Sequence, residues 1–212
     1  GRAAGVAMCK VALDKKDPLS ELATWWLLNR MSNSWAAFNL DAAMKRSGLY
    51  DPDTITIDEM VVPKPAAAAT LSIEDVVKLR GDSARGKNVI AACIMCHATG
   101  GVGAEVGPAL DGWGRGKSAE VIARAIVDPN AEIAQGYDAT ELRTTDGLRI
   151  QGLLIKQGDP LMMRSHGGVT QLIPAKRVAS RQRMTESLMP SAAQLGLTAQ
   201  NVADLVAFLT VK

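Results

Sequence analysis

Apolar residues recur at helical spacing along much of the chain, which predicts amphipathic helices. The segments with a helical pattern are 19–30, 35–48, 82–93, 118–128 and 198–211. Local signals support the ends of some of them. Ser20 and Glu21 mark a start, Gly48 marks a stop, and Ser118 is a typical N-cap of a helix that ends before Pro129. The pattern alone therefore predicts a largely helical protein.

The hydrophobic pattern changes between residues 137 and 184, where short runs of alternating polar and apolar residues replace the helical pattern. Turn signals cut these runs at Asp146-Gly147, at Gly158-Asp159-Pro160 and at Gly167-Gly168. We therefore predict four or five antiparallel strands, which form a β insert at 137–183 within a helical domain.

The first two helical segments predict a small helical unit over residues 1–60. Its aromatic residues, Trp25, Trp26, Trp35 and Phe38, are interpreted as core packing between two helices rather than as an aromatic binding site. The Pro/Ala stretch VVPKPAAAAT at 61–70 is typical of a linker. The predicted domains are therefore 1–60 and 71–212.

Composition excludes several classes of function. The 212 residues are 47% hydrophobic and 22% charged, with a formal net charge of +2, as in a soluble globular protein without a basic nucleic-acid surface. No apolar run is long enough to predict a transmembrane segment, and GRAAGVAMCK lacks the apolar core of a signal peptide, as a mature or excised protein also would. Three cysteines do not make a disulfide framework; Cys9 is left over as a free thiol, with an intermolecular disulfide as the alternative.

The stretch AACIMCHATG at 91–100 places Cys93, Cys96 and His97 in the order C-x-x-C-H. Two thiols at this spacing add to the two vinyl groups of a haem as thioethers, and the histidine becomes an axial ligand of the iron. A zinc site would need four ligands, and the other Cys and His residues, Cys9 and His166, lie in distant segments. A thioredoxin-like pair would follow a strand rather than a helix.

The context of the motif resembles class I cytochrome c. GDSARGKNVIAACIMCH at 81–97 is similar to that family's first helix and haem motif, and DLVAFL at 204–209 is similar to its last helix. The resemblance implies a close crossing of these helices at Gly86, with Phe208 facing it. VGPAL at 106–110 resembles the loop in which a proline carbonyl, here that of Pro108, accepts the Nδ1 proton of the axial histidine.

The resemblance also implies a second axial ligand. SLMP at 187–190 is similar to the segment that supplies a methionine before a proline, which makes Met189 the candidate. Met184, His166 and an open or water-bound iron stay as alternatives. Leu110 and Trp113 are expected to contact the macrocycle, and plain core packing is compatible with that expectation.

Further segments follow in a fixed order along the chain: LRGDSARGK, C-x-x-C-H, VGPAL, DPNAEIAQGYDATELRTTDGLRIQGLL, SLMP and LGLTAQNVADLVAFL. In this order, nearly the whole chain resembles the haem-binding C-x-x-C-H domain of large planctomycete and verrucomicrobial proteins. That family implies that residues 1–60 end a HEAT-like helical repeat region and that the chain is part of a longer exported polypeptide with a dehydrogenase-like propeller. The fold class expected is mainly α: a class I cytochrome c helical fold with an antiparallel β insert, preceded by a small HEAT-like segment. The resemblance also implies a periplasmic or exported location, because bacteria of this kind attach haem c outside the cytoplasmic membrane.

The expected function is single-electron transfer by one covalent haem c, to or from a redox partner protein or a fused dehydrogenase domain. With both axial positions filled, the chain itself is not expected to be an enzyme. A haem ligand sensor or a peroxidase-like enzyme with an open or displaceable distal position is the alternative. The β insert would cover one haem edge or dock a partner, and its extended run LRIQGLLIKQ offers an edge for a homodimer.

Overall fold

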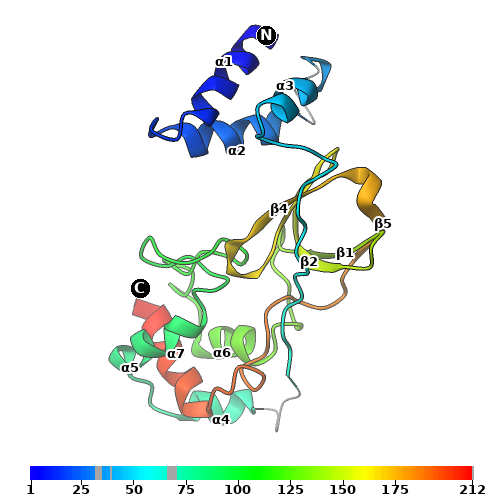
Figure 1. Ribbon diagram of the computed structural model, residues 1–212. Helices are drawn as coiled ribbons and strands as arrows, with labels where there is room; N and C mark the ends of the chain where they lie inside the picture. The colour runs from blue at the N-terminus through cyan, green and yellow to red at the C-terminus, as the bar shows by residue number, and fades with distance from the viewer. Residues whose placement is uncertain (32–34, 39, 66–70, 212) are drawn as a thin grey trace. The chain divides into compact units, whose positions relative to one another are not determined.

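The computed structural model describes residues 1–31, 35–38, 40–65 and 71–211 (Figure 1). The helices are α1 (Arg2–Leu13), α2 (Ser20–Met31), α3 (Asp41–Arg46), α4 (Ile73–Lys78), α5 (Ser83–Val89), α6 (Ala119–Val127) and α7 (Ala199–Val211). Short 3₁₀ helices are η1 (Ala36–Phe38), η2 (Ile90–Ala92), η3 (His166–Gly168) and η4 (Ala175–Arg177). The strands are β1 (Ala139–Thr144), β2 (Arg149–Lys156), β3 (Leu161–Arg164), β4 (Thr170–Ile173) and β5 (Val178–Arg183).

The predicted strands form one five-stranded sheet in the order β4-β3-β2-β1-β5, so the prediction of four or five antiparallel strands is confirmed. Strands β1 and β2 pair with Ala139 opposite Leu153 and Leu142 opposite Ile150. Their turn closes at Gly147, which has a φ of +92° and donates its N–H to the carbonyl of Thr144 at 3.0 Å. This is the conformation that favours glycine at a hairpin turn, as the Asp-Gly signal predicts.

The expected fold class is wrong. Helix accounts for 37% of the residues and strand for 16%, so the chain is an α/β protein rather than a mainly α class I cytochrome c. The strands form a complete sheet with its own buried side chains, among them Leu142, Ile150 and Ile173. A sheet that buries such residues is a structural layer in its own right and not an appendage to a helical domain.

The chain divides into two compact units. One contains Gly1–Asp58, Leu154–Met163 and Gln171–Ala179; the other contains Glu59–Leu153, Arg164–Thr170 and the chain from Ser180 onward. Segments of the predicted insert 137–183 therefore occur in both units. Of the predicted linker 61–70, residues 66–70 lie outside the described residues.

The first unit has a helical core. Predicted helix 19–30 matches α2, predicted segment 35–48 holds η1 and the short α3, and α1 was not predicted from the sequence. The buried apolar residues of this helical core are Cys9, Ala12, Ala23, Leu27, Leu40, Met44 and Tyr50. The ring of Trp35 lies 4.6 Å from that of Trp26 and 5.4 Å from that of Phe38, both edge-on, which is the geometry of aromatic core packing.

The second unit has a helical core of its own, in which α4, α5 and α6 gather around α7 (Figure 1). The crossing of α5 and α7 is close because Gly86 has no side chain. A Cβ atom at Gly86 would lie 2.1 Å from the carbonyl oxygen of Asp204 and 2.7 Å from Cβ of Phe208. The close approach expected at Gly86 and Phe208 is therefore present.

An ion pair between buried Asp204 and solvent-exposed Arg85 holds the same crossing together. The carboxylate of Asp204, 2% exposed, accepts two hydrogen bonds from the Arg85 guanidinium at 2.7 and 2.8 Å. It also accepts the Asp82 N–H at 2.8 Å and the Gln200 amide at 2.9 Å. The hydrogen bond from Arg85 is the largest cause that lowers the pKa of Asp204 to about 2.

Replacing Asp204 by asparagine should destabilise the second unit by about 2 kcal/mol, because a charge-assisted network loses its acceptor charge. The lowered pKa means that this stability is present above the unfolded-state pKa of about 3.9 and is lost as the pH falls towards 2. Urea unfolding should therefore show the full difference between the midpoints of the variant and the wild type at pH 7 and a smaller difference at pH 3, where Asp204 of the folded protein is still ionised. Glu120→Gln, which removes an exposed pair with Arg124, is the control and should leave the unfolding midpoint in place. Equal midpoints for Asp204→Asn and wild type at pH 7 would contradict the prediction.

Within the described ranges, no helix is both long enough and apolar enough to cross a bilayer.

Candidate haem-attachment site

The C-x-x-C-H motif begins where η2 ends, in the second unit. The N–H of Cys93 donates to the carbonyl of Ile90, and the Cys93 carbonyl accepts the N–H groups of Cys96 at 3.0 Å and His97 at 2.9 Å. Cys93 packs against the helical core, while Cys96 packs against a second apolar cluster. That cluster, here called the sheet-side cluster, consists of buried Val62, Val106, Ala139, Leu153 and Leu188. The tight turn thus places the Cys93 thiol against the helical core and the Cys96 thiol against the sheet-side cluster.

Both thiols are free and only partly exposed. Burial, with a smaller contribution from Cys96, raises the pKa of Cys93 to about 11. Burial also raises the pKa of Cys96. The side chains are therefore neutral thiols at neutral pH, which disfavours an activated thiolate of the thioredoxin kind.

The imidazole of His97 has a defined orientation. Its Nδ1 lies 2.7 Å from the carbonyl oxygen of Pro108, so Nδ1 carries the proton and donates, because a carbonyl only accepts. Burial lowers the pKa of His97, and the Pro108 carbonyl opposes that shift. The ring is thus a neutral imidazole whose Nε2 lone pair is left to bind a metal.

The loop after the motif holds the Pro108 carbonyl in place. The Cys96 carbonyl accepts the N–H groups of Val106 at 2.9 Å and Gly107 at 2.7 Å. Gly107 packs directly on the imidazole, since a Cβ atom there would lie 2.3 Å from Cε1 of His97. Only glycine fits at this position, and the sequence pattern VGPAL was interpreted for its proline alone.

The same loop is closed at its other end by Asp111. Its carboxylate accepts the Thr99 hydroxyl at 3.2 Å and the Gly100 N–H at 2.8 Å. Sequence reasoning missed Asp111, although an acidic residue after a glycine-rich run is a common turn signal.

The other predicted contact residues lie near the motif. Leu110 is buried in the same helical core against which Cys93 packs, and Trp113 packs on that core too. Lys117 lies 5.2 Å from the centre of the Trp113 ring, in a cation–π contact. Both Leu110 and Trp113 therefore contribute apolar surface on the Cys93 side of the motif.

The structure brings the predicted methionine segment to the other side. Leu188 is buried in the sheet-side cluster against which Cys96 packs, and Met184 packs on the same cluster. Met189 is half-buried, and its N–H donates to the Ser187 hydroxyl at 3.1 Å. Segment 184–189 thus lies beside the motif.

His166 lies in the turn between β3 and β4, where its Nδ1 is buried and has no hydrogen-bond partner among the described residues. The next residue of that turn, Gly167, contacts the motif, because its N–H donates to the carbonyl of Met95 at 2.8 Å. The turn predicted at Gly167-Gly168 is present between β3 and β4, and its contact with the motif was not predicted.

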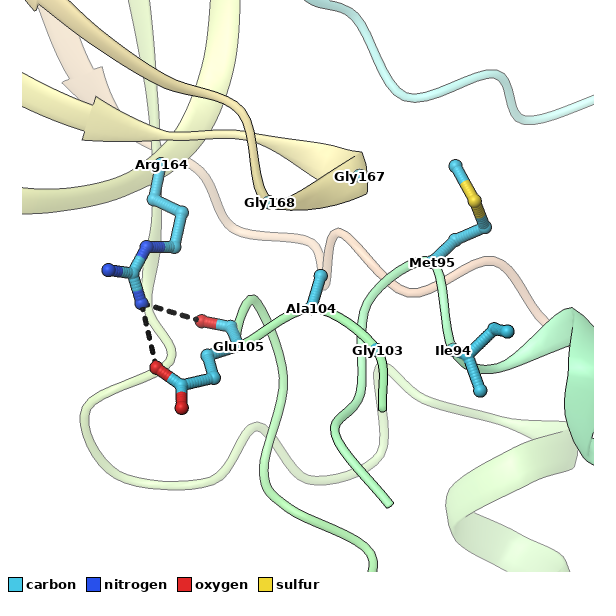
Figure 2. A pocket seen from close by; sticks show the side chains of 8 residues that line it. All are labelled: Ile94, Met95, Gly103, Ala104, Glu105, Arg164, Gly167 and Gly168. Atoms are coloured by element: carbon cyan, nitrogen blue, oxygen red, sulfur yellow. Dashed lines mark hydrogen bonds and ion pairs between the residues drawn. The ribbon is translucent and has the colours of Figure 1, made fainter. Parts of the chain in front are cut away.

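A cavity of about 460 Å³ lies between the motif and this turn (Figure 2). It is lined by Ile94, Met95, Gly103, Ala104, Glu105, Arg164, Gly167 and Gly168. Figure 2 shows Arg164 reaching from the end of β3 towards Glu105. The cavity is therefore beside Ile94 and Met95, the two residues between the cysteines, and the two cysteines and His97 do not line it.

In the part of the chain that the structure describes, no group of three or more His, Cys, Asp or Glu side chains is arranged to hold a metal ion. No protein-family model matches the chain, and no curated protein matches it either, so the resemblance to haem-binding C-x-x-C-H domains stays a hypothesis that rests on the residues themselves.

Proposed function

We propose that the second unit is a c-type cytochrome module that carries one covalent haem and transfers single electrons. The observation that carries this proposal is the 2.7 Å contact between Nδ1 of His97 and the carbonyl oxygen of Pro108. His97 directly follows Cys96, and both Cys96 and Cys93 are partly buried free thiols. Such a contact fixes the tautomer, orients the ring and raises the basicity of Nε2 as a metal ligand.

The residues present fit a haem. Cys93 and Cys96 are protonated thiols next to apolar clusters, the environment that the edge of a macrocycle needs. Each thiol would add across a vinyl group: sulfur bonds to one vinyl carbon and the thiol hydrogen goes to the other. The addition needs no oxidant or reductant.

The bound group would supply a one-electron couple, and the chain would set its surroundings. His97 would be the proximal ligand, and Leu110 and Trp113 would exclude water on the Cys93 side. Met189 is proposed as the second ligand, because its neighbour Leu188 is buried in the apolar cluster against which Cys96 packs. A thioether in that position favours ferrous iron and raises the potential.

The electrons would pass to or from a redox partner protein or a dehydrogenase domain of the same polypeptide. A periplasmic or exported location belongs to the same proposal, since it follows from haem c.

The first test is the attachment itself. The intact mass of the purified protein should exceed that of the polypeptide by one haem, and the haem should survive acid–acetone extraction. Cys93→Ser and Cys96→Ser should each leave a single thioether, visible as a shifted pyridine haemochrome band. Cys9→Ser is the matched control, because Cys9 is a buried free thiol of the first unit, and it should keep both thioethers. Haem that extracts completely, or an unmodified mass after expression with a haem-attachment system, would refute the proposal.

A further inference from the structure

The turn between β3 and β4 is built to project two glycines. The N–H of Ser165 donates to the carbonyl of Val169 at 2.8 Å, and that of Gly168 donates to the carbonyl of Ser165 at 3.1 Å. Gly167 and Gly168 have φ values of +72° and +77°. Side-chain-bearing residues rarely adopt this conformation, so consecutive glycines allow a turn this tight.

The tip of the turn makes a backbone contact with the motif. The Gly167 N–H donates to the carbonyl of Met95, the residue that precedes Cys96, at 2.8 Å. The neighbouring carbonyl groups are served from the loop after the motif, since that of Ile94 accepts the N–H of Ala104 at 2.9 Å. The sheet therefore supplies the donor for the Met95 carbonyl.

The base of the turn makes a second contact, with the loop after the motif. Nη1 of Arg164 donates to the carboxylate of Glu105 at 3.2 Å and lies 3.4 Å from its carbonyl oxygen (Figure 2). Gly168 lies against the same loop, because a Cβ atom there would be 3.2 Å from Cβ of Ala104. The turn thus contacts the motif at Met95 and the following loop at Ala104 and Glu105, on two sides of the cavity.

We propose that Arg164, Gly167 and Gly168 are positioning residues that clamp the haem-attachment loop and, through it, the His97 ring. The inference rests on the proposed function. The clamped residues Ala104 and Glu105 lead directly to Val106 and Gly107, which bond the Cys96 carbonyl, and then to the Pro108 carbonyl that accepts the Nδ1 proton. The β3–β4 turn therefore controls how firmly that carbonyl meets the imidazole.

The clamp has a direct consequence for the redox couple. When the loop is loosened, the Nδ1–H···O bond weakens, and the imidazole becomes a poorer donor to iron. A poorer donor stabilises ferric iron less, so the reduction potential rises. If the turn only stabilised the fold, loosening it would lower the unfolding midpoint and leave the reduction potential unchanged.

The test compares glycines of similar conformation in two turns of the same sheet. Gly168→Ala would press a methyl group on Ala104, whereas Gly147→Ala has a φ of +92° and nothing within 4 Å of its new Cβ atom. Both variants carry the strain of a positive φ, and only the first pushes on the loop. Arg164→Met removes the second contact, and Arg164→Lys is the conservative partner.

Two measurements on the full chain decide the outcome. In Gly168→Ala and Arg164→Met, amide exchange of Ala104, Val106 and Gly107 should quicken about tenfold, and the reduction potential of the haem-bearing protein should rise. Gly147→Ala and Arg164→Lys should resemble the wild type in both. Exchange and potential equal to those of Gly147→Ala would overturn the clamp. A chain that never acquires haem refutes the proposed function instead, and exchange in the haem-free chain then still supports or overturns the contact.

Discussion

His97→Ala is expected to abolish the low-spin spectrum of the haem while leaving the haem covalently attached. The thioethers depend on Cys93 and Cys96, whereas the low-spin state depends on a strong nitrogen donor below the iron. The structure gives His97 the features of that donor, a neutral ring with Nδ1 bonded to Pro108 at 2.7 Å. Oxidised and reduced absorption spectra, with intact mass as the check on attachment, measure the effect.

Two matched variants sharpen this prediction. His166→Ala removes the other histidine and should keep the low-spin spectrum. Pro108→Ala retains a backbone carbonyl, which is the group that accepts the Nδ1 proton, so it should keep the low-spin state as well. A normal low-spin spectrum in His97→Ala, or its loss in His166→Ala alone, would show that the proximal ligand is assigned to the wrong histidine.

Met189→Ala is expected to give a high-spin haem with a lower reduction potential that binds exogenous ligands. Removing a thioether removes a donor that favours ferrous iron and leaves a coordination position open. Met189 precedes Pro190, which restricts its backbone to extended geometry, and it follows Leu188, which is buried in the cluster against which Cys96 packs. Potentiometry and carbon monoxide titration of the ferrous protein are the measurements.

Met184→Ala is the matched control, because Met184 packs on the same apolar cluster as Cys96. It should lose some stability through the smaller side chain and keep the spectrum and the potential. The reverse pattern, with Met184→Ala high-spin and Met189→Ala unchanged, would refute the assignment. Ready binding of carbon monoxide by the wild-type ferrous protein would refute simple electron transfer and favour a ligand sensor or a peroxidase-like enzyme.

Local patterns in the sequence determined the secondary structure of most of the chain. Helix α6 follows its Ser118 cap, whose hydroxyl accepts the N–H of Val121, and the Asp146-Gly147 pair turns the chain between β1 and β2. Such signals act within a few residues, so a linear pattern contains them. The spacing of Cys93, Cys96 and His97 is likewise local, and together with its sequence context it predicts haem attachment rather than zinc binding or thiol redox chemistry.

Only the tertiary structure decided how these elements share a core. Periodicity located the strands of 137–183 but did not show that they form a full sheet, so the mainly α expectation was wrong. Helix α1 was not predicted from the sequence. It packs closely through Gly5 against Trp35 and Leu40, which lie in later segments of the chain. Both outcomes depend on contacts between residues far apart in the sequence, and the hydrophobic pattern of a short segment does not contain such contacts.

The candidate site divides in the same way. The sequence specified which side chains could bind a haem, because thiols and imidazole carry their chemistry with them. The fold supplied what surrounds them: Gly107 against the His97 ring, and the hydrogen bond from Gly167 to Met95 that ties a sheet to the motif. The two residues of that bond, Gly167 and Met95, are 72 positions apart in the sequence. Their meeting depends on how the sheet packs, which no local pattern encodes.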